Sequence, residues 1–229
     1  YYAQCELEGA NEHQVEESQK AVAKMEVIIG DPDRLRAVAE DFIKHYETRV
    51  AEGATVAGKA MFVCSNRNIA YDFYKIVKEL RPEWTEKKIC DDGVVLSEKD
   101  KKELKPMEKI KLVMTRNKDD EKDLFDMLGT KEDRKEFDRQ FKNPKSNFKI
   151  AIVVDMWLTG FDVPELDTIY IDKPIQQHTL IQTISRVNRV CEGKDKGLIV
   201  DYIGIKKNMN TALKKYTNFE SEEFEGVEQ

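Results

Sequence analysis

Residues 148–172 read FKIAIVVDMWLTGFDVPELDTIYID, in which two short apolar runs stand on either side of a polar turn. The runs, Phe148–Val154 and Asp167–Asp172, have the length and apolar continuity of strands that are covered on both faces. Comparable runs occur at Lys59–Cys64 (KAMFVC), Ile110–Thr115 (IKLVMT) and Gly197–Tyr202 (GLIVDY). Such runs, separated by stretches of helical character, predict an α/β fold: a parallel sheet with helices on both faces.

Helices are predicted between these strands. One covers Asn66–Leu80, two broken at Gly129 lie within residues 119–142, and one covers Gln177–Cys191. Another begins at Asp31-Pro32, because proline is favoured in the first helical turn. Residues 84–108 are polar and irregular, which predicts a connection with a short helix.

The loops that follow the strands are expected to share one functional edge. The carboxyl ends of parallel strands lie at the same edge of a sheet, and ligands of such sheets bind beyond those ends. The loops after Cys64, Thr115, Val154 and Asp172 are therefore the places to look for a site.

The composition limits the class of protein. Of 229 residues, 40% are hydrophobic and 36% are charged, as in a globular protein with a charge-rich surface. The apolar runs are too short to span a bilayer and no signal peptide is visible, so we expect a cytoplasmic protein without a membrane partner. The four cysteines form no C-x-x-C pair and no histidine cluster accompanies them. That pattern argues against a metal site and against a disulfide framework.

The net charge of −6 is unevenly distributed. Residues 1–30 carry −4 and residues 217–229 carry −5, which leaves +3 for residues 31–216. A mildly basic body between acidic ends permits a local phosphate-binding face without demonstrating one.

The segment QHTLIQTISRVNRVC, residues 177–191, carries the most specific pattern. On a helix, its apolar residues fall on one side, whereas Gln182, Arg186 and Arg189 stand at i, i+4 and i+7 on the other. Arginine suits phosphate because its guanidinium is planar, permanently charged and able to donate two parallel hydrogen bonds. A solvated face of an amphipathic helix is nevertheless the commoner explanation of an isolated R-x-x-R pair.

Two loops add weaker signals. In the turn TGFD, residues 159–162, Gly160 allows close approach of the backbone to a ligand, and Asp162 could hold a ribose hydroxyl or position an arginine. The residues SNR at 65–67 follow a strand and open a helix, whose free amides suit a phosphate. Ordinary turn chemistry is the commoner explanation of the first loop, and capping alone by Ser65 or Asn66 explains the second at least as well as phosphate binding does.

The order of these three segments is more informative than any one of them. A strand–S-x-R–helix, a strand–D-x-x-x-T-G-x-D and a helix with Q-x-x-x-R-x-x-R resemble motifs four, five and six of the superfamily 2 helicases and translocases. The resemblance covers about residues 59–202. Within that superfamily, WLTGFDVPELDTIYIDKP, LIQTISRVNR and the upstream DPDRLRAVAEDFIKHYETR are similar to the motor subunit of type I restriction enzymes.

The resemblance implies a RecA-like domain of the P-loop NTPase class, the second of two domains that clamp ATP and Mg²⁺. Arg186 and Arg189 would then act as arginine fingers that stabilise charge developing during hydrolysis. Gly160, Asp162 and Gln182 would bind or orient the nucleotide.

The same resemblance implies a DNA track at the strand-end loops. Ser65, Arg67 and Thr159 would contact the phosphate backbone of one DNA strand, with affinity that is independent of sequence and sensitive to salt.

The resemblance also suggests how the chain is divided. Residues 1–56 would lead in from a first motor domain, residues 57–206 would form the helicase C-terminal domain, and residues 207–229 would form an acidic connection. The first motor domain, which would hold the Mg²⁺, and a nuclease domain are expected elsewhere in the same subunit. Methylation and specificity subunits are the further partners, and this chain alone would hydrolyse little or no ATP.

Other activities are less well supported. The residues GATVAGKA at 53–60 nearly match a phosphate loop, but they end in alanine and precede a strand. The E-x-K at residues 103–105 lies in a polar connection, with Asp91 and Asp92 upstream, which argues against a nuclease centre. A related motor acting on RNA or in DNA repair and a non-hydrolysing interaction domain remain alternatives. Trp157 is a candidate for base stacking, although packing is its commoner role.

Overall fold

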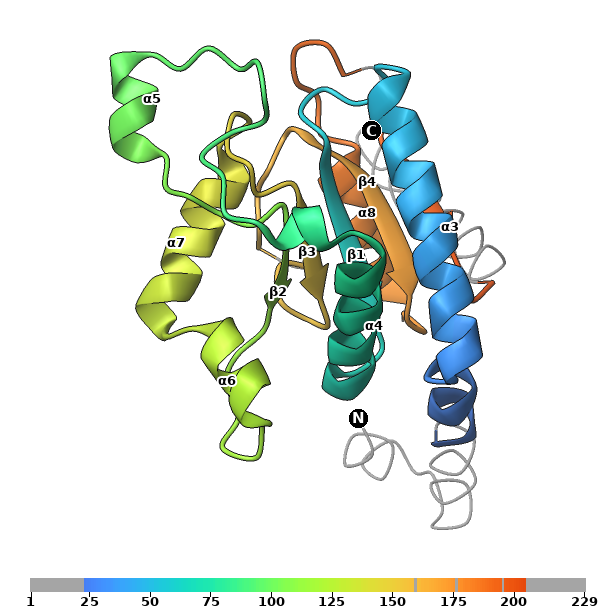
Figure 1. Ribbon diagram of the computed structural model, residues 1–229. Helices are drawn as coiled ribbons and strands as arrows, with labels where there is room; N and C mark the ends of the chain where they lie inside the picture. The colour runs from blue at the N-terminus through green and yellow to red at the C-terminus, as the bar shows by residue number, and fades with distance from the viewer. Residues whose placement is uncertain (1–22, 159, 176, 195, 205–229) are drawn as a thin grey trace, which may run out of the picture.

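Five parallel strands form one sheet in the order β2-β3-β1-β4-β5 (Figure 1). The computed structural model describes residues 23–158, 160–175, 177–194 and 196–204. Its strands are β1 Lys59–Cys64, β2 Ile110–Val113, β3 Ile150–Val153, β4 Leu166–Asp172 and β5 Leu198–Asp201. Every predicted strand is present, although β2, β3 and β5 are shorter than predicted. The predicted parallel α/β architecture is confirmed.

Helices cover both faces of this sheet (Figure 1). They are α3 Pro32–Ala51, α4 Arg67–Leu80, α5 Glu98–Glu103, α6 Lys122–Leu128, α7 Lys131–Lys142 and α8 Gln177–Val187, with a 3-10 turn, η1, at Pro82–Thr85. Side chains of α3 and α4 pack into one buried cluster, and those of α7 and α8 pack into a second cluster on the opposite face. The predicted break at Gly129 and the short helix within residues 84–108 are confirmed.

Local capping positions the two helices that lie nearest to the strand-end loops. Asp31 caps α3 by accepting a hydrogen bond from the backbone N–H of Arg34 at 3.0 Å. Asn66 caps α4 by accepting one from Ile69 N at 3.0 Å. The sequence predicted that either Ser65 or Asn66 caps α4. Asn66 does so, and the Ser65 hydroxyl makes another contact.

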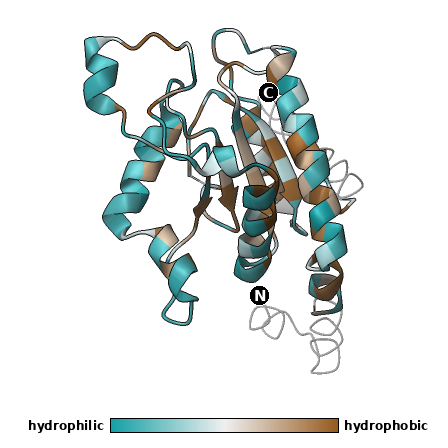
Figure 2. Ribbon diagram, in the orientation of Figure 1, coloured by the Kyte–Doolittle hydropathy of each residue, from teal (hydrophilic) through white to brown (hydrophobic). Residues whose placement is uncertain are grey.

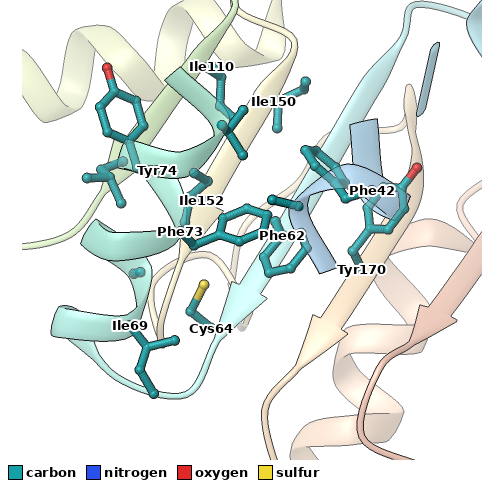
Figure 3. Close-up of a cluster of buried hydrophobic side chains, with 14 of the residues drawn as sticks. Phe42, Phe62, Cys64, Ile69, Phe73, Tyr74, Ile110, Ile150, Ile152 and Tyr170 are labelled. Carbon is teal, nitrogen blue, oxygen red and sulfur yellow. The ribbon is translucent and has the colours of Figure 1, made fainter. Parts of the chain in front are cut away.

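An aromatic cluster fills the space between the sheet and helices α3 and α4 (Figure 3). Phe62 of β1 stacks on Phe73 of α4 with ring centroids 3.9 Å apart, and Phe42 of α3 meets Tyr170 of β4 edge-on at 4.7 Å. Trp84 is only 4% exposed and packs against the same cluster. Burial of each such side chain contributes about 1.5–3 kcal/mol, so α3 is fixed to the sheet by its aromatic face.

Alternate residues of each strand serve the other face. Met61 and Val63 of β1 lie in the cluster under α7 and α8, whereas Phe62 and Cys64 lie in the aromatic cluster. Figure 2 shows that the strands are largely hydrophobic, while the helices carry polar residues on their outer sides. Among the described residues, no helix combines the length and apolar character that crossing a membrane requires.

Helix α8 runs back along the sheet, from the carboxyl ends of the strands toward their amino ends. Because β4 and β5 are parallel, the connection between them must return from the carboxyl end of β4 to the amino end of β5. The start of α8 therefore lies toward the carboxyl edge, and Arg186, in its last turn, lies toward the amino edge.

Candidate functional site

The loops at the carboxyl edge of the sheet are joined by hydrogen bonds. Ser65 Oγ, after β1, donates to the backbone oxygen of Asp172 at the end of β4, over 2.8 Å. Lys173 Nζ, after β4, donates to the backbone oxygen of Val154 after β3, over 3.0 Å. Strand ends that are far apart in sequence therefore meet at one edge, as the parallel order predicted.

Arg67 is held in place by the loop that follows β2. Its Nη2 lies 2.6 Å from both carboxylate oxygens of Asp120, and its Nη1 donates to the backbone oxygen of Thr115 over 2.7 Å. Asp120 also accepts from the backbone N–H of Asn117, and its side chain is 6% exposed. The sequence did not identify Asp120, because it lies in a charged stretch where no spacing distinguishes it from its neighbours.

A buried ion pair joins α3 to the end of β4. Arg34 donates through both Nη atoms to the carboxylate of Asp172, with Nη1 at 3.1 Å, and these hydrogen bonds raise the pKa of the guanidinium above its ordinary value. The Asp172 side chain is fully buried, and that of Arg34 is 23% exposed. Arg34 also donates to the backbone oxygens of Ile29 and Tyr202, over 3.0 and 3.4 Å. Sequence analysis missed this pair, and its one signal was an acidic residue at the end of an apolar strand.

The structure corrects the predicted length of the arginine helix. Helix α8 ends at Val187, so Arg189 lies beyond it, and the predicted helical face of Gln182, Arg186 and Arg189 is wrong for Arg189. Arg189 Nη1 instead contacts Asp162 Oδ2 at 2.6 Å. Both side chains are about half exposed, 42% and 52%. Positioning an arginine is one of the two roles that the sequence suggested for Asp162.

The end of α8 is set by contacts between distant segments. A β-carbon on Gly197 would lie 2.2 Å from the backbone oxygen of Val187, so only glycine allows the chain to double back here. Lys194 Nζ fixes the turn by donating to the backbone oxygens of Pro164 and Leu166, over 2.9 and 2.7 Å. Helical periodicity carries no information about such contacts, which is why the predicted helix was too long.

Among the described residues, Arg186 of α8 has one buried polar side-chain atom that lacks a hydrogen-bond partner. Its Nε is shielded from solvent and has no hydrogen-bond partner among the described residues. A buried donor without a partner costs about 1–3 kcal/mol. Among the described residues, Arg49 Nε and Asp167 Oδ2 are in the same state, so this feature alone does not mark a phosphate site. Gln182, one turn earlier, already interacts within the protein.

The turn that precedes β4 combines an open backbone with a packed ring. Gly160 has a φ of 70°, and a β-carbon there would meet no atom within 4 Å, which leaves its backbone accessible. Trp157 stacks on Phe161 with ring centroids 4.1 Å apart and lies 5.2 Å from Phe141, so its ring serves packing. Thr159, predicted to contact DNA, lies outside the described residues.

Residues of the sequence patterns that resembled a phosphate loop and a nuclease centre make contacts within the fold. Lys59 is fully buried in β1, its Nζ donates to Phe148 O over 2.5 Å, and burial lowers its pKa well below the ordinary value. Asp91 pairs with Lys149 at 3.1 Å. In the described part of the chain, no three His, Cys, Asp or Glu side chains gather as a metal site would require.

The candidate residues thus form two groups at different ends of the sheet. The carboxyl-edge group contains Ser65 and Arg67 with their partners Asp172, Asp120 and Arg34. The α8-end group contains Gly160, Asp162, Arg186 and Arg189, with Gln182 one turn earlier on α8.

Comparison with known proteins places the chain in a family. Residues 56–204 match the family model of type I restriction enzyme subunit R domain 3. The chain belongs to the type I restriction enzyme R subunit family. The HindI endonuclease subunit of Haemophilus influenzae, a type I restriction enzyme, is 37% identical over 206 residues, which are 89% of this chain and 18% of that relative. The SsaAORF53P endonuclease subunit of Staphylococcus saprophyticus is 49% identical over 72 residues, 31% of this chain and 8% of the relative.

The fold of this R-subunit chain also has a counterpart among solved structures. A fragment described as an HsdR subunit of a type I restriction enzyme from Vibrio vulnificus YJ016 has a TM-score of 0.54 and 14% identity. The likeness covers 81% of this chain and 29% of that one. The family resemblance inferred from the motifs and the RecA-like fold are both confirmed.

Proposed function

We propose that this chain is the second motor domain of an ATP-dependent double-stranded DNA translocase in a type I restriction endonuclease complex. Membership of the R subunit family supports a motor domain of that enzyme class. The observation that carries the finer proposal is the α8-end group, where Arg186 lies in the last turn of α8 and Arg189, paired with Asp162, lies just beyond it.

The α8-end group fits the terminal phosphates of ATP. Arg189 is half exposed beside Asp162, so its guanidinium has donors to offer an anion. Arg186 lies at the same helix end, and its shielded Nε has no partner among the described residues. Gly160 leaves backbone open for close approach. When bound, ATP supplies a hydrolysable phosphoanhydride, and Arg186 and Arg189 stabilise the charge that develops on it. Gln182 orients the helix face from which Arg186 projects.

The carboxyl-edge group fits the phosphate backbone of DNA. Arg67, whose side chain is 29% exposed, offers a fixed cation. Ser65 offers a hydroxyl, which turns from the backbone oxygen of Asp172 in order to donate to a phosphate. Thr159 joins them in the proposal. Such contacts are independent of sequence and weaken as salt rises, because they replace counterions on the duplex.

The remainder of the complex follows from the same proposal. A first motor domain holds Mg²⁺ and the phosphate loop, and a nuclease domain belongs to the same subunit. Residues 1–56 lead in from that first domain, residues 57–206 form the helicase domain, and residues 207–229 continue beyond it. Methylation and specificity subunits complete a cytoplasmic assembly in which this chain alone hydrolyses little ATP.

Substitution of Arg186 in the full-length subunit tests the proposal. Arg186→Ala is expected to lower DNA-stimulated ATP hydrolysis by about a thousandfold, in the range known for arginine fingers, while leaving DNA affinity within a factor of about two. Arg189→Ala is expected to act in the same direction. Arg36→Ala, which removes an exposed arginine of α3, is the matched control.

The result that contradicts the proposal is equally clear. Unchanged ATP turnover and unchanged translocation in both Arg186→Ala and Arg189→Ala would leave the RecA-like fold as an interaction domain. A loss in both variants, with Arg36→Ala unaffected, supports the motor assignment.

A further inference from the structure

Lys173 lies over the centre of the carboxyl edge. It directly follows β4, and its Nζ donates to the backbone oxygen of Val154, after β3, over 3.0 Å. Strand β1 lies between β3 and β4, so the lysine side chain reaches across the end of β1 (Figure 1). Burial raises the pKa of Cys64, the last residue of β1, and the charge of Lys173 opposes that shift, as expected for a nearby ammonium. The cation is therefore close to the loop that contains Ser65 and Arg67.

The ammonium of Lys173 keeps a hydrogen-bond donor for a ligand. A protonated lysine carries three N–H donors. Lys173 uses one for Val154 and one for the carboxylate of Asp155, and the third has no acceptor among the described residues. The side chain is 18% exposed. A phosphate oxygen, which only accepts hydrogen bonds, would find both a positive charge and an N–H at this position.

The partner of Lys173 distinguishes it from two arginines of the same edge. Arg34 and Arg67 pair with carboxylates whose side chains are 0% and 6% exposed, and such buried partners are costly to displace. Asp155 is 82% exposed and has no other hydrogen bond or ion pair among the described residues. Exposed ion pairs contribute little to stability. A phosphate can therefore replace Asp155 at low cost, while Val154 keeps the ammonium in place.

We propose that Lys173 binds the phosphate backbone of DNA and that Asp155 is the counterion which a phosphate displaces from it. The inference rests on the proposed function, in which the carboxyl edge is the DNA track. Asp155 then competes with each phosphate, so the duplex is bound less tightly than the cation alone would bind it. A motor that moves along DNA must release each phosphate that it binds, and a competing carboxylate favours that release.

Salt titrations of DNA affinity in the full-length subunit test this inference. The probe is a fluorescent duplex of arbitrary sequence, and the variants are Lys173→Gln, Lys173→Arg and Asp155→Asn. Glutamine still carries an N–H for the backbone oxygen of Val154, and arginine retains the charge. Lys142→Gln and Asp138→Asn are the matched controls, because they alter an exposed pair of α7 whose charged atoms are 2.9 Å apart. That helix leads to the amino end of β3, away from the carboxyl edge.

The expected results differ in sign for the two partners. Lys173→Gln should weaken binding by about fivefold and reduce the slope of log affinity against log salt by about 0.9, the value for one phosphate contact. Lys173→Arg should keep that slope. Asp155→Asn should strengthen binding by about threefold, because the competitor for the ammonium is removed. Each control should change the affinity less than about twofold. Thermal midpoints close to that of the parent exclude a general loss of stability.

Three outcomes would overturn the inference. An unchanged salt slope in Lys173→Gln would show that Lys173 contacts no phosphate. An unchanged or weaker affinity in Asp155→Asn would show that Asp155 does not compete with DNA and, if weaker, that it orients the lysine. An equal gain in Asp155→Asn and Asp138→Asn would assign the effect to net charge alone.

Failure of the proposed function gives a different pattern. Arg67→Gln and Lys173→Gln would then both leave DNA affinity unchanged, and Arg186→Ala would leave ATP turnover unchanged, which rejects this inference as well. A loss of affinity in Arg67→Gln and of turnover in Arg186→Ala, with an unchanged salt slope in Lys173→Gln, rejects this inference alone.

Discussion

The carboxyl-edge group and the α8-end group contain similar charged residues in different degrees of burial. At the edge, the side chains of Asp172 and Asp120 are 0% and 6% exposed, and each is bonded to an arginine. At the end of α8, Asp162 and Arg189 are about half exposed. Buried pairs cannot lose one partner cheaply, whereas exposed pairs can. The edge is therefore a fixed surface, and the α8 end is free to exchange partners.

The largest effect that would test this contrast is expected at Asp172. Asp172→Ala removes the buried partner of Arg34, and we expect the free energy of unfolding to fall by about 3–5 kcal/mol. Urea denaturation of the chain measures it. Glu79→Ala, which removes an exposed partner of Arg36, is the control and should cost less than about 1 kcal/mol. Equal costs for the two variants would mean that the edge is no more fixed than the surface of α3.

A smaller change in stability is expected at the α8 end. Asp162→Ala should lower the free energy of unfolding by less than about 1 kcal/mol, because the pair with Arg189 is exposed. In the full-length subunit the same variant should slow DNA-stimulated ATP hydrolysis by about tenfold, since Arg189 loses the carboxylate that orients it. A large loss of stability, or no loss of rate, would remove the distinction between the two groups.

The smallest effect concerns pH and His45 of α3, which lies between the aromatic cluster and the surface. Its Nδ1 is 2.8 Å from the Tyr170 hydroxyl, and desolvation, with the nearby charge of Arg49, lowers its pKa below the ordinary 6.5. The unfolded chain therefore takes up the proton at higher pH than the folded chain. Stability should be constant above about pH 6.5 and should fall as the pH decreases toward the lowered pKa.

Urea denaturation at about pH 7.5 and about pH 5.5 measures this dependence. His45→Gln, which keeps a polar side chain without a titrating group, should show a smaller difference between the two conditions. A dependence that is the same in both proteins would assign it to other groups.

The sequence predicted the strands and their common edge because both follow from local patterns. Apolar runs such as Lys59–Cys64 mark buried strands, and the intervening helices require parallel order. The partners of the charged residues could not be predicted in the same way. Arg34 and Asp172 are 138 residues apart, and Arg67 and Asp120 are 53 apart. Neither pair has a spacing that would reveal it.

The candidate site was likewise predicted in part. The arginines were singled out by a regular helical spacing, which does not hold for Arg189 because α8 ends at Val187. That end depends on Gly197 passing close to Val187, a contact that the spacing does not reveal. That Asp162 could position an arginine was one of two roles suggested by the glycine-containing turn, but the sequence did not indicate that the arginine is Arg189. Trp157 shows the limit most clearly, since an aromatic ring in a loop has the same sequence signature whether it stacks on Phe161 or on a base.

The aromatic face of α3 has a consequence for transplanting this domain between related enzymes. The match to the family begins at residue 56, after α3 has ended, yet Phe42 inserts among Phe62, Phe73 and Tyr170. A chimera whose junction falls between α3 and β1 would combine a helix from one parent with the aromatic pocket of another. Grafts that carry residues 32–51 along with the sheet take Phe42 and the aromatic rings that it contacts from the same parent.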